Sequence, residues 1–260
     1  MTDTAEVYVT IDAPPVEPRL YGLFSVAPPF TPDDVNWQLG VRWAAGPGCA
    51  VARPTVDQCI TGTVPGPLVP DESYCNWYGT KPFNVYVLGR RSLPRSRDVA
   101  EAEAAAALTA AEERAVEQHL FTEILAAATV GPTYVGDGSA RKALGWIEHA
   151  IASFYNGRGV IHMSRFAASM LSQQLFVSGS TLVTRLGTPV VAGAGYGTAA
   201  GDELVMAGSG ALVAYRGPVD TDQQAMNRAV NDYDVLAQRA YAVGWDCVAV
   251  KSAATESPAP

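Results

Sequence analysis

The sequence predicts an α+β fold in which an N-terminal arm and an extended two-stranded loop precede one long helix. Residues 36–88 combine tryptophans with many prolines and glycines, which interrupt helices and regular sheets. Residues 98–128 are of the opposite kind, because they are rich in Ala and Glu and indicate a single helix. Short strands and helices are expected in the remainder of the chain.

Residues 1–35 alternate only at their start and then contain several prolines, which predicts an extended arm with one short strand. Such an arm is ordered only when it lies on another surface, usually that of a neighbour.

The extended loop is predicted over 36–88, with strands at 37–43 and 83–88. A long irregular stretch is unusual inside a compact domain, yet this one carries too many aromatics for a disordered linker. We therefore expect its aromatic side chains to be buried by another subunit. The candidates are Trp37, Trp43, Trp77 and Tyr78.

The helix predicted over 98–128 has an apolar stripe. Val116, Leu120 and Ile124 recur at i, i+4 and i+8, and Phe121 and Leu125 widen this stripe. Three glutamates, Glu113, Glu117 and Glu123, are expected to face away from it. The stripe is predicted to pack on late strands of the same chain.

Further elements follow from periodicity and capping residues. A second amphipathic helix should end near Asn156, and Ser164 should cap a third helix after a short buried strand. One or two long strands are expected near the C-terminus, bent at Gly244. The strands expected between these elements and at the end cover 160–163, 181–186, 203–206, 211–215 and 233–250.

Four arginines lie close together between the loop and the long helix. A basic cluster of this kind is either solvated, in contact with another subunit, or in contact with phosphate. We place it at a subunit contact. Its members are Arg90, Arg91, Arg95 and Arg97.

Composition bounds the function. The 260-residue chain has a formal net charge of −8, which argues against a dedicated nucleic-acid-binding module. No apolar run is long enough to span a bilayer, and the first residues lack a signal-peptide pattern. We therefore expect a soluble protein made in the cytoplasm, without a membrane partner.

The four cysteines are Cys49, Cys59, Cys75 and Cys247, and none forms a C-x-x-C pair. Reduced, partly buried thiols are the expectation for a cytoplasmic protein. A disulfide formed after cell lysis is the alternative.

The sequence offers no catalytic, cofactor-binding or metal-ligating set. His119, His149 and His162 are expected to be ordinary surface or core residues, and neither a G-x-S-x-G elbow nor a phosphate-binding P-loop occurs. GAGYGT at 193–198 imitates a dinucleotide fingerprint but has Thr198 at the sixth position. We expect a flexible loop there. A structural protein is favoured over an oxidoreductase.

The order of these elements resembles the major capsid protein of tailed double-stranded DNA bacteriophages, the Hong Kong 97-like fold. RGVIHMSRFAASML at 158–171 is similar to the family's strand-then-helix unit, and TRLGTPVVAG at 184–193 is similar to its strand, Gly, x, Pro, Val element. AQRAYAVGWDCVAV at 237–250 is similar to its closing strand. The resemblance covers roughly residues 36–252.

This resemblance implies a subunit that self-assembles as pentamers and hexamers into the icosahedral head shell enclosing phage DNA. It implies a virion location, with separate scaffolding, portal and decoration proteins as further partners. An encapsulin-like compartment, or a head-completion or tail-tube ring, is the alternative. The implied division is an arm (1–35), an extended loop (36–88), a peripheral domain with the spine helix (89–137 and 231–252), an axial domain (138–230) and a tail (253–260).

Overall fold

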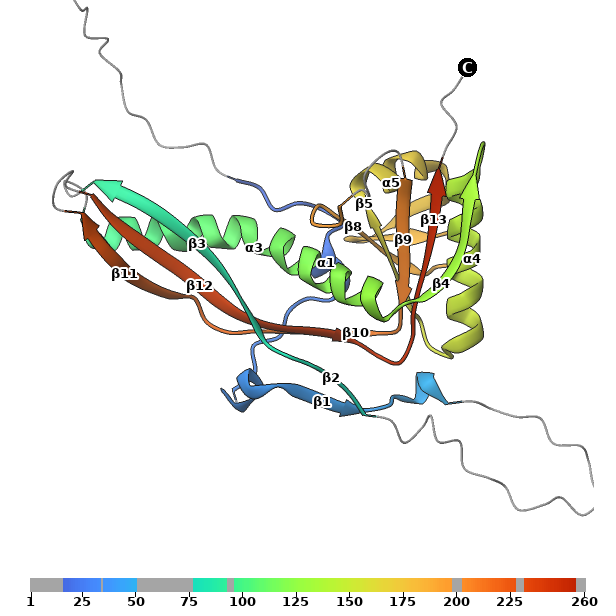
Figure 1. Ribbon diagram of the computed structural model, residues 1–260, viewed down its shortest axis with the longest axis horizontal. Coiled ribbons are helices and arrows are strands. Elements are labelled where there is room, and N and C mark those ends of the chain that lie inside the picture. Colours follow the sequence, from blue (N-terminus) through green and yellow to red (C-terminus); the bar gives the residue numbers. More distant parts are fainter. Residues whose placement is uncertain are drawn as a thin grey trace, which may run out of the picture.

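The computed structural model describes residues 16–33, 35–50, 77–92, 96–197, 203–227 and 232–255. Figure 1 shows an elongated molecule in which the long helix α3 (Arg97–Ala127) runs between two larger sheets. A four-stranded sheet lies along the first part of α3, and a seven-stranded sheet lies at its C-terminal end. The mixed helix-and-strand class predicted from the sequence is confirmed.

The position of α3 and its apolar stripe are also confirmed. Val116, Leu120 and Ile124 are buried, and Phe121 is nearly so. The helix ends at Ala127, four residues before Gly131 and Pro132. These two residues lie inside the next strand, β4 (Thr129–Val135), which is at the edge of its sheet. A sheet edge tolerates proline because one row of backbone N–H groups there has no ladder partner.

The four-stranded sheet is centred on β12, which pairs antiparallel with each of the other strands. Val85 and Val235 are buried on the face that packs against α3, as is Tyr241. The strands are β3 (Phe83–Ser92), β10 (Leu212–Arg216), β11 (Asp220–Asn227) and β12 (Asp232–Trp245).

The predicted pairing of the loop strands is wrong in its partner. β1 (Val41–Ala44) pairs with β2 (Trp77–Thr80), whereas β3, which was expected to pair with β1, pairs with β12. Alternation in a sequence predicts a strand but not its neighbour. The predicted first strand also starts too early, because Val35–Leu39 form the 3-10 helix η1.

The seven-stranded sheet is covered on both faces. Ile161 and Met206 pack against Ile147 of α4 (Ser139–Phe154), while Val160 and Val191 share a core with α3. In order across the sheet, its strands are β4, β13 (Ala249–Thr255), β9 (Glu203–Ser209), β5 (Val160–Ser164), β8 (Pro189–Gly193), β7 (Thr181–Thr184) and β6 (Leu175–Ser178).

Further short helices lie between these elements. Ser164 caps α5 (Arg165–Met170) as predicted, since its Oγ accepts a hydrogen bond from the Ala167 N–H at 3.1 Å. η4 (Ser172–Gln174) follows α5, and α1 (Leu23–Val26) packs beside β8 and α3.

The C-terminal strands do not bend at Gly244, where a bend was expected. Gly244 stays inside β12, and the chain turns at Asp246–Val248 into β13, which joins the other sheet. β10 and β11, from the range expected for an axial domain, pair with β12. The division into peripheral and axial domains stays a prediction.

Candidate subunit-contact site

The base of the extended loop is held on its own subunit. β1 and β2 lie along β12 (Figure 1), and the Thr80 hydroxyl donates a hydrogen bond to the Val243 carbonyl at 2.8 Å. The Trp43 ring packs on Gly244, where an added Cβ would come within 2.7 Å of the ring. Residues 51–76 of the predicted loop lie outside the described residues.

The four aromatic candidates do not share one environment. Trp37 is only 9% exposed and its ring stacks on that of Tyr215, with 6.3 Å between centroids. Trp43 and Tyr78 are partly buried within the chain. Three of the four rings therefore pack within their own chain, and their burial by another subunit stays a prediction.

Trp77 is the candidate that presents its ring to the outside. Its side chain is 64% exposed, and the Arg42 guanidinium lies 5.8 Å from the ring centroid. An exposed tryptophan of this kind is typical of a contact that another surface completes. Its contact with another subunit stays a prediction.

A disulfide joins the loop base to the end of the four-stranded sheet. Cys49, at the end of the 3-10 helix η2 (Pro47–Cys49), is bonded to Cys247 with an S–S distance of 2.05 Å. This pair is thus in the oxidised state, which was the alternative to reduced thiols. Its sequence separation of 198 residues gives no local signal. Cys59 and Cys75 lie outside the described residues.

Asp246 is next to this bond. One carboxylate oxygen and the two sulfurs lie within 4.8 Å of one another, which is a metal-ligand combination that the sequence spacing did not suggest. Because the two sulfurs are bonded to each other, neither is a thiolate ligand in this state.

Glu117 of α3 is buried, which corrects the expectation that it faces away from the apolar stripe. One carboxylate oxygen accepts the Leu23 N–H at 3.1 Å and the other accepts the Gly195 N–H at 2.8 Å. Burial raises the pKa of Glu117, and these two N–H donors oppose that rise. Glu113 accepts the Phe24 N–H in the same way at 2.9 Å. The two carboxylates thus satisfy the free N–H groups at the start of α1.

A second buried carboxylate ties α3 to the four-stranded sheet. Both oxygens of Glu112 accept from one guanidinium nitrogen of Arg239 on β12, at 2.7 and 2.9 Å. Burial raises the pKa of Glu112, and the Arg239 charge opposes that rise. The two adjacent acidic residues therefore have structural roles within the chain. Glu112 ties α3 to β12, and Glu113 caps α1.

His162 lies fully buried in β5 with both ring nitrogens engaged. The Ser209 hydroxyl donates to the Gly210 carbonyl, so it accepts from Nε2–H of His162 at 2.9 Å. Nδ1 then accepts from the Tyr196 hydroxyl, also at 2.9 Å. Burial lowers the pKa of His162 to about 3. The ring is a neutral structural bridge, in keeping with the expectation of a core histidine.

The glycine loop after β8 contacts α3 where it is described. Gly195 donates to Glu117, and an added Cβ at Gly195 would lie 2.1 Å from the Arg114 carbonyl oxygen. Tyr196 is buried beneath the same helix and stacks on Phe121. Gly195 therefore packs directly on the backbone of α3, and the flexibility of the loop stays a prediction. Thr198 lies outside the described residues.

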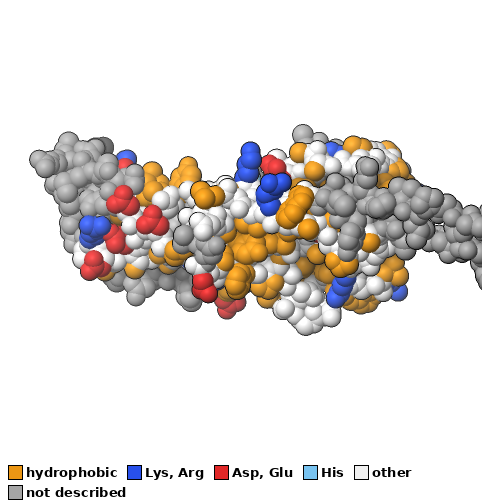
Figure 2. Space-filling view, turned by 90° about the horizontal axis from the view of Figure 1, so that it is seen from below, with side chains coloured by type: hydrophobic (Ala, Val, Ile, Leu, Met, Phe, Trp, Pro, Cys, Tyr) orange, Lys and Arg blue, Asp and Glu red, His pale blue; other side chains and the backbone are white. Residues whose placement is uncertain are grey.

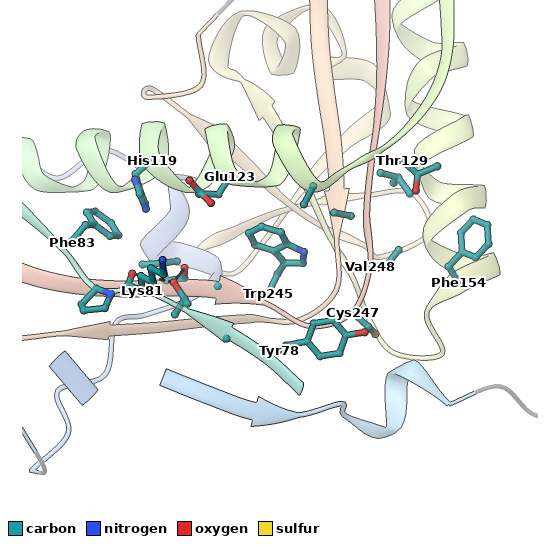
Figure 3. Close-up of a pocket in the computed structure, with 18 residues that line it drawn as sticks. Tyr78, Lys81, Phe83, His119, Glu123, Thr129, Phe154, Trp245, Cys247 and Val248 are labelled. Atoms are coloured by element: carbon teal, nitrogen blue, oxygen red, sulfur yellow. Dashed lines mark hydrogen bonds between the residues drawn. The ribbon is translucent and has the colours of Figure 1, made fainter. Parts of the chain in front are cut away.

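A cleft of about 830 Å³ lies between the loop base, β12 and the C-terminal part of α3. Figure 3 shows His119 and Glu123 pointing from α3 into this space, where Trp245 and Lys81 also lie. The His119 ring packs on Phe83 with 3.8 Å between centroids. The walls combine aromatic rings with charged side chains, which suits a polypeptide contact.

No known family profile matches the sequence, and no curated protein matches it. Solved structures do match. The capsid of an empty GTA particle is 12% identical and has a TM-score of 0.57, with 98% of this chain and 96% of that chain covered. A Mycobacterium phage Che8 structure is 14% identical with a TM-score of 0.52, covering 97% and 98%. The chain has the tailed-phage major capsid fold.

A virus-like particle from Pyrococcus furiosus is similar as well. It is 10% identical, with a TM-score of 0.53, and the match covers 89% of this chain and 91% of that chain. The phage capsid fold therefore extends over nearly the whole chain.

Within this capsid fold, exposed apolar side chains collect on both sheets. Figure 2 shows hydrophobic side chains gathered over the middle of one face, with charged ones toward the end that holds the tip of the four-stranded sheet. Tyr86 and Leu88 are exposed on β3, an edge strand, and Phe176 and Val177 are exposed on the edge strand β6. None of these four residues was predicted as a contact candidate, although Tyr86 and Leu88 belong to the alternating strand predicted at 83–88.

Two of the four arginines of the basic cluster have acidic partners within the capsid fold. Arg90 pairs with Asp234 across β3 and β12 at 3.0 Å, and Arg97 pairs with Glu101 one helical turn away at 2.5 Å. The Glu101 carboxylate raises the pKa of Arg97. Arg91 lies in β3, and Arg95 falls outside the described residues. A subunit contact at this cluster stays a prediction.

Among the described helices, none combines the length and apolarity needed to cross a membrane.

Proposed function

We propose that this chain is the major capsid protein of a tailed phage and that it self-assembles into the icosahedral head shell around double-stranded DNA. The observation that carries the proposal is the correspondence with the GTA-particle capsid, which covers 98% of this chain with a TM-score of 0.57. A match of this extent includes the spine helix, both sheets and the base of the loop. The role is structural, with no catalytic step.

The distribution of exposed apolar groups supports self-assembly. β3 and β6 belong to different sheets, and each presents apolar side chains on an edge strand. Unpaired strand edges favour pairing with another chain. Each contact of this kind is modest, but a closed lattice of pentamers and hexamers makes many of them at once, which strengthens the association. The four-stranded sheet with α3 would act as the peripheral domain, and the seven-stranded sheet as the axial domain.

Charge fits a container for nucleic acid. The formal net charge of −8 disfavours adhesion of packaged DNA to the subunit, and Arg90 and Arg97 are paired with carboxylates of the same chain. DNA would then be held without sequence specificity. Scaffolding, portal and decoration proteins are the further partners of such a shell, which is made in the host cytoplasm and ends in the virion.

Electron microscopy of the purified full chain tests this function. Closed icosahedral particles are the expected result. Rings would instead assign a head-completion or tail-tube role. A monodisperse monomer that binds a small molecule, detected as a thermal shift, would contradict this proposal and indicate an enzyme.

An encapsulin-like compartment is the second candidate, and the similarity to the Pyrococcus furiosus virus-like particle favours it. Shells isolated from the native source distinguish the two. Packaged double-stranded DNA supports the phage capsid, whereas an enclosed protein cargo supports the compartment.

A further inference from the structure

The Cys49–Cys247 bond closes one foot of the extended loop. β1 leads into η2, which ends at Cys49. One further described residue follows before the loop continues at residue 51. The other foot, β2, is held without a covalent bond by the Thr80–Val243 hydrogen bond and by its continuation into β3. The disulfide therefore controls the attachment of one loop foot to its own subunit.

The foot is docked by contacts that do not require the bond. The Asn156 N–H donates to the Gly48 carbonyl at 2.8 Å, and the Gly46 N–H donates to the Asp246 carboxylate at 3.4 Å. Gly48 lies so close to the Tyr155 ring that an added Cβ would come within 2.4 Å of it. These contacts hold two thiols near each other before any oxidation.

The two sulfurs differ in access and in backbone strain. Cys49 is buried, whereas Cys247 is partly exposed. Cys247 has φ +28°, an unusual conformation for a residue with a side chain, in a turn closed by the Val248 N–H and the Asp246 carbonyl at 2.6 Å. A strained backbone conformation persists only where the surrounding structure holds it in place, and the disulfide helps to hold Cys247.

We propose that Cys49–Cys247 is a redox latch, open during assembly in the reducing cytoplasm and closed after release into an oxidising medium. The proposal rests on the proposed capsid function. Reduced thiols are the rule in the cytoplasm. With the latch open, only these non-covalent contacts hold the loop foot, and they can break and re-form while the loop finds its place on a neighbour. A closed latch fixes that arrangement within the subunit.

Closure needs an oxidant, for which a small-molecule disulfide such as oxidised glutathione suffices. The accessible Cys247 thiolate attacks it, forming a mixed disulfide and releasing one glutathione thiolate. The Cys49 thiolate then attacks the Cys247 sulfur and releases the second. Two protein thiols are oxidised to one disulfide, one glutathione disulfide is reduced to two thiols, and the two protons pass to the released thiolates.

The test starts with particles of the full chain, released from cells into N-ethylmaleimide so that existing thiols are trapped. Peptide mass spectrometry should find Cys49 and Cys247 alkylated. Particles released without the trap and then treated with oxidised glutathione should show the Cys49–Cys247 peptide. Trypsin cleavage after the exposed Arg42, which lies at the loop base, should slow by about tenfold or more on closure.

Variants locate the effect. Cys49→Ser and Cys247→Ser should each assemble normally and show no slowing of cleavage upon oxidation, whereas Cys75→Ser should behave as the wild type. A bond already present in the trapped sample would overturn the latch, as would closure without a change in cleavage. Loss of assembly in the serine variants, with reduced wild type still assembling, would also overturn it. If the reduced wild type forms no shells at all, the proposed capsid function fails instead.

Discussion

The two larger sheets bury their strands in different ways. β5 of the seven-stranded sheet is buried at every position, because α4 covers one face and α3 with α1 the other. β3 of the four-stranded sheet alternates, with Val85 buried against α3 while Tyr86 and Leu88 are exposed. Continuous burial is typical of a strand in a sheet that is covered on both faces. Alternating burial is typical of a strand in a sheet that is covered on one face.

The difference assigns separate tasks to the sheets. The centre of the seven-stranded sheet, at β5, is packed within the subunit, and His162 bridges polar groups in this interior. The outer face of the four-stranded sheet is partly covered by the loop base, where Trp37 stacks on Tyr215. Its β3 side remains open. We therefore expect changes in β5 to affect folding, and changes on the exposed face of β3 to affect assembly.

The largest expected effect falls where the sheets share one core. Leu120 belongs to the apolar cluster that contains residues of both sheets. Leu120→Ala should lower the free energy of unfolding by about 2–5 kcal/mol, since it leaves a cavity in packed surroundings. Urea unfolding of the unassembled subunit measures this. Gln118→Ala, at an exposed position of the same helix, should change it by less than about 0.5 kcal/mol. Equal effects would mean that the stripe is not buried.

The contribution of His162 to the pH dependence of stability probes the seven-stranded sheet. His162 has a pKa of about 3 when folded and an ordinary value of 6.5 when unfolded. Between these values the unfolded chain binds the proton and the folded chain does not. Stability should therefore fall as pH decreases from 6.5 toward 3, by up to about 1.4 kcal/mol per pH unit from this group.

Urea unfolding at several pH values should show a shallower fall for His162→Gln than for the wild type. His149→Gln, at an exposed position of α4, is the matched control and should keep the wild-type dependence. Identical pH dependences for wild type and His162→Gln would show that the ring is not held neutral.

The tryptophans separate folding from assembly at the loop base. Trp43 packs on Gly244, so Trp43→Ala should destabilise the subunit by about 1–3 kcal/mol. Trp77 is 64% exposed, so Trp77→Ala should leave the unassembled subunit unchanged while lowering particle yield. Urea unfolding measures the first effect and sedimentation the second. Normal particle yield from Trp77→Ala would remove this residue from the subunit contacts.

The smallest effect is expected on the outer face of the four-stranded sheet. The Arg90–Asp234 ion pair is exposed on the arginine side, so Arg90→Gln should cost at most about 1 kcal/mol, and less at high salt. A double-mutant cycle with Asp234→Asn isolates the pair. If the same change halts assembly without altering unfolding, the basic cluster is a subunit contact.

The sequence predicted the parts that carry a local period. The long helix, its apolar stripe, the Ser164 cap and most strands follow from spacing alone. The partner of β3 was not predictable in this way, because alternation is the same whichever strand lies alongside. β11 was missed because its residues are polar and form an edge strand.

The contact residues were harder to predict for a related reason. Trp37 and Trp77 look alike in the sequence, yet one is stacked inside and the other is exposed. The burial of Glu117 depends on two N–H donors that come from residues 94 and 78 positions away. Cys49 and Cys247 meet only in the folded chain. Long-range partners of single residues leave no periodic trace.

Glu113 and Glu117 accept the first N–H groups of α1, and this has a consequence for the order in which a growing chain can fold. Leu23 leaves the ribosome well before Glu117, because 94 residues separate them. At ordinary elongation rates this interval is roughly 5–20 s. Throughout that time water, and not these carboxylates, must accept hydrogen bonds from the first N–H groups of α1. The earliest-made segment of the described fold must therefore wait for the helix that receives it, and it is among the last to be seated.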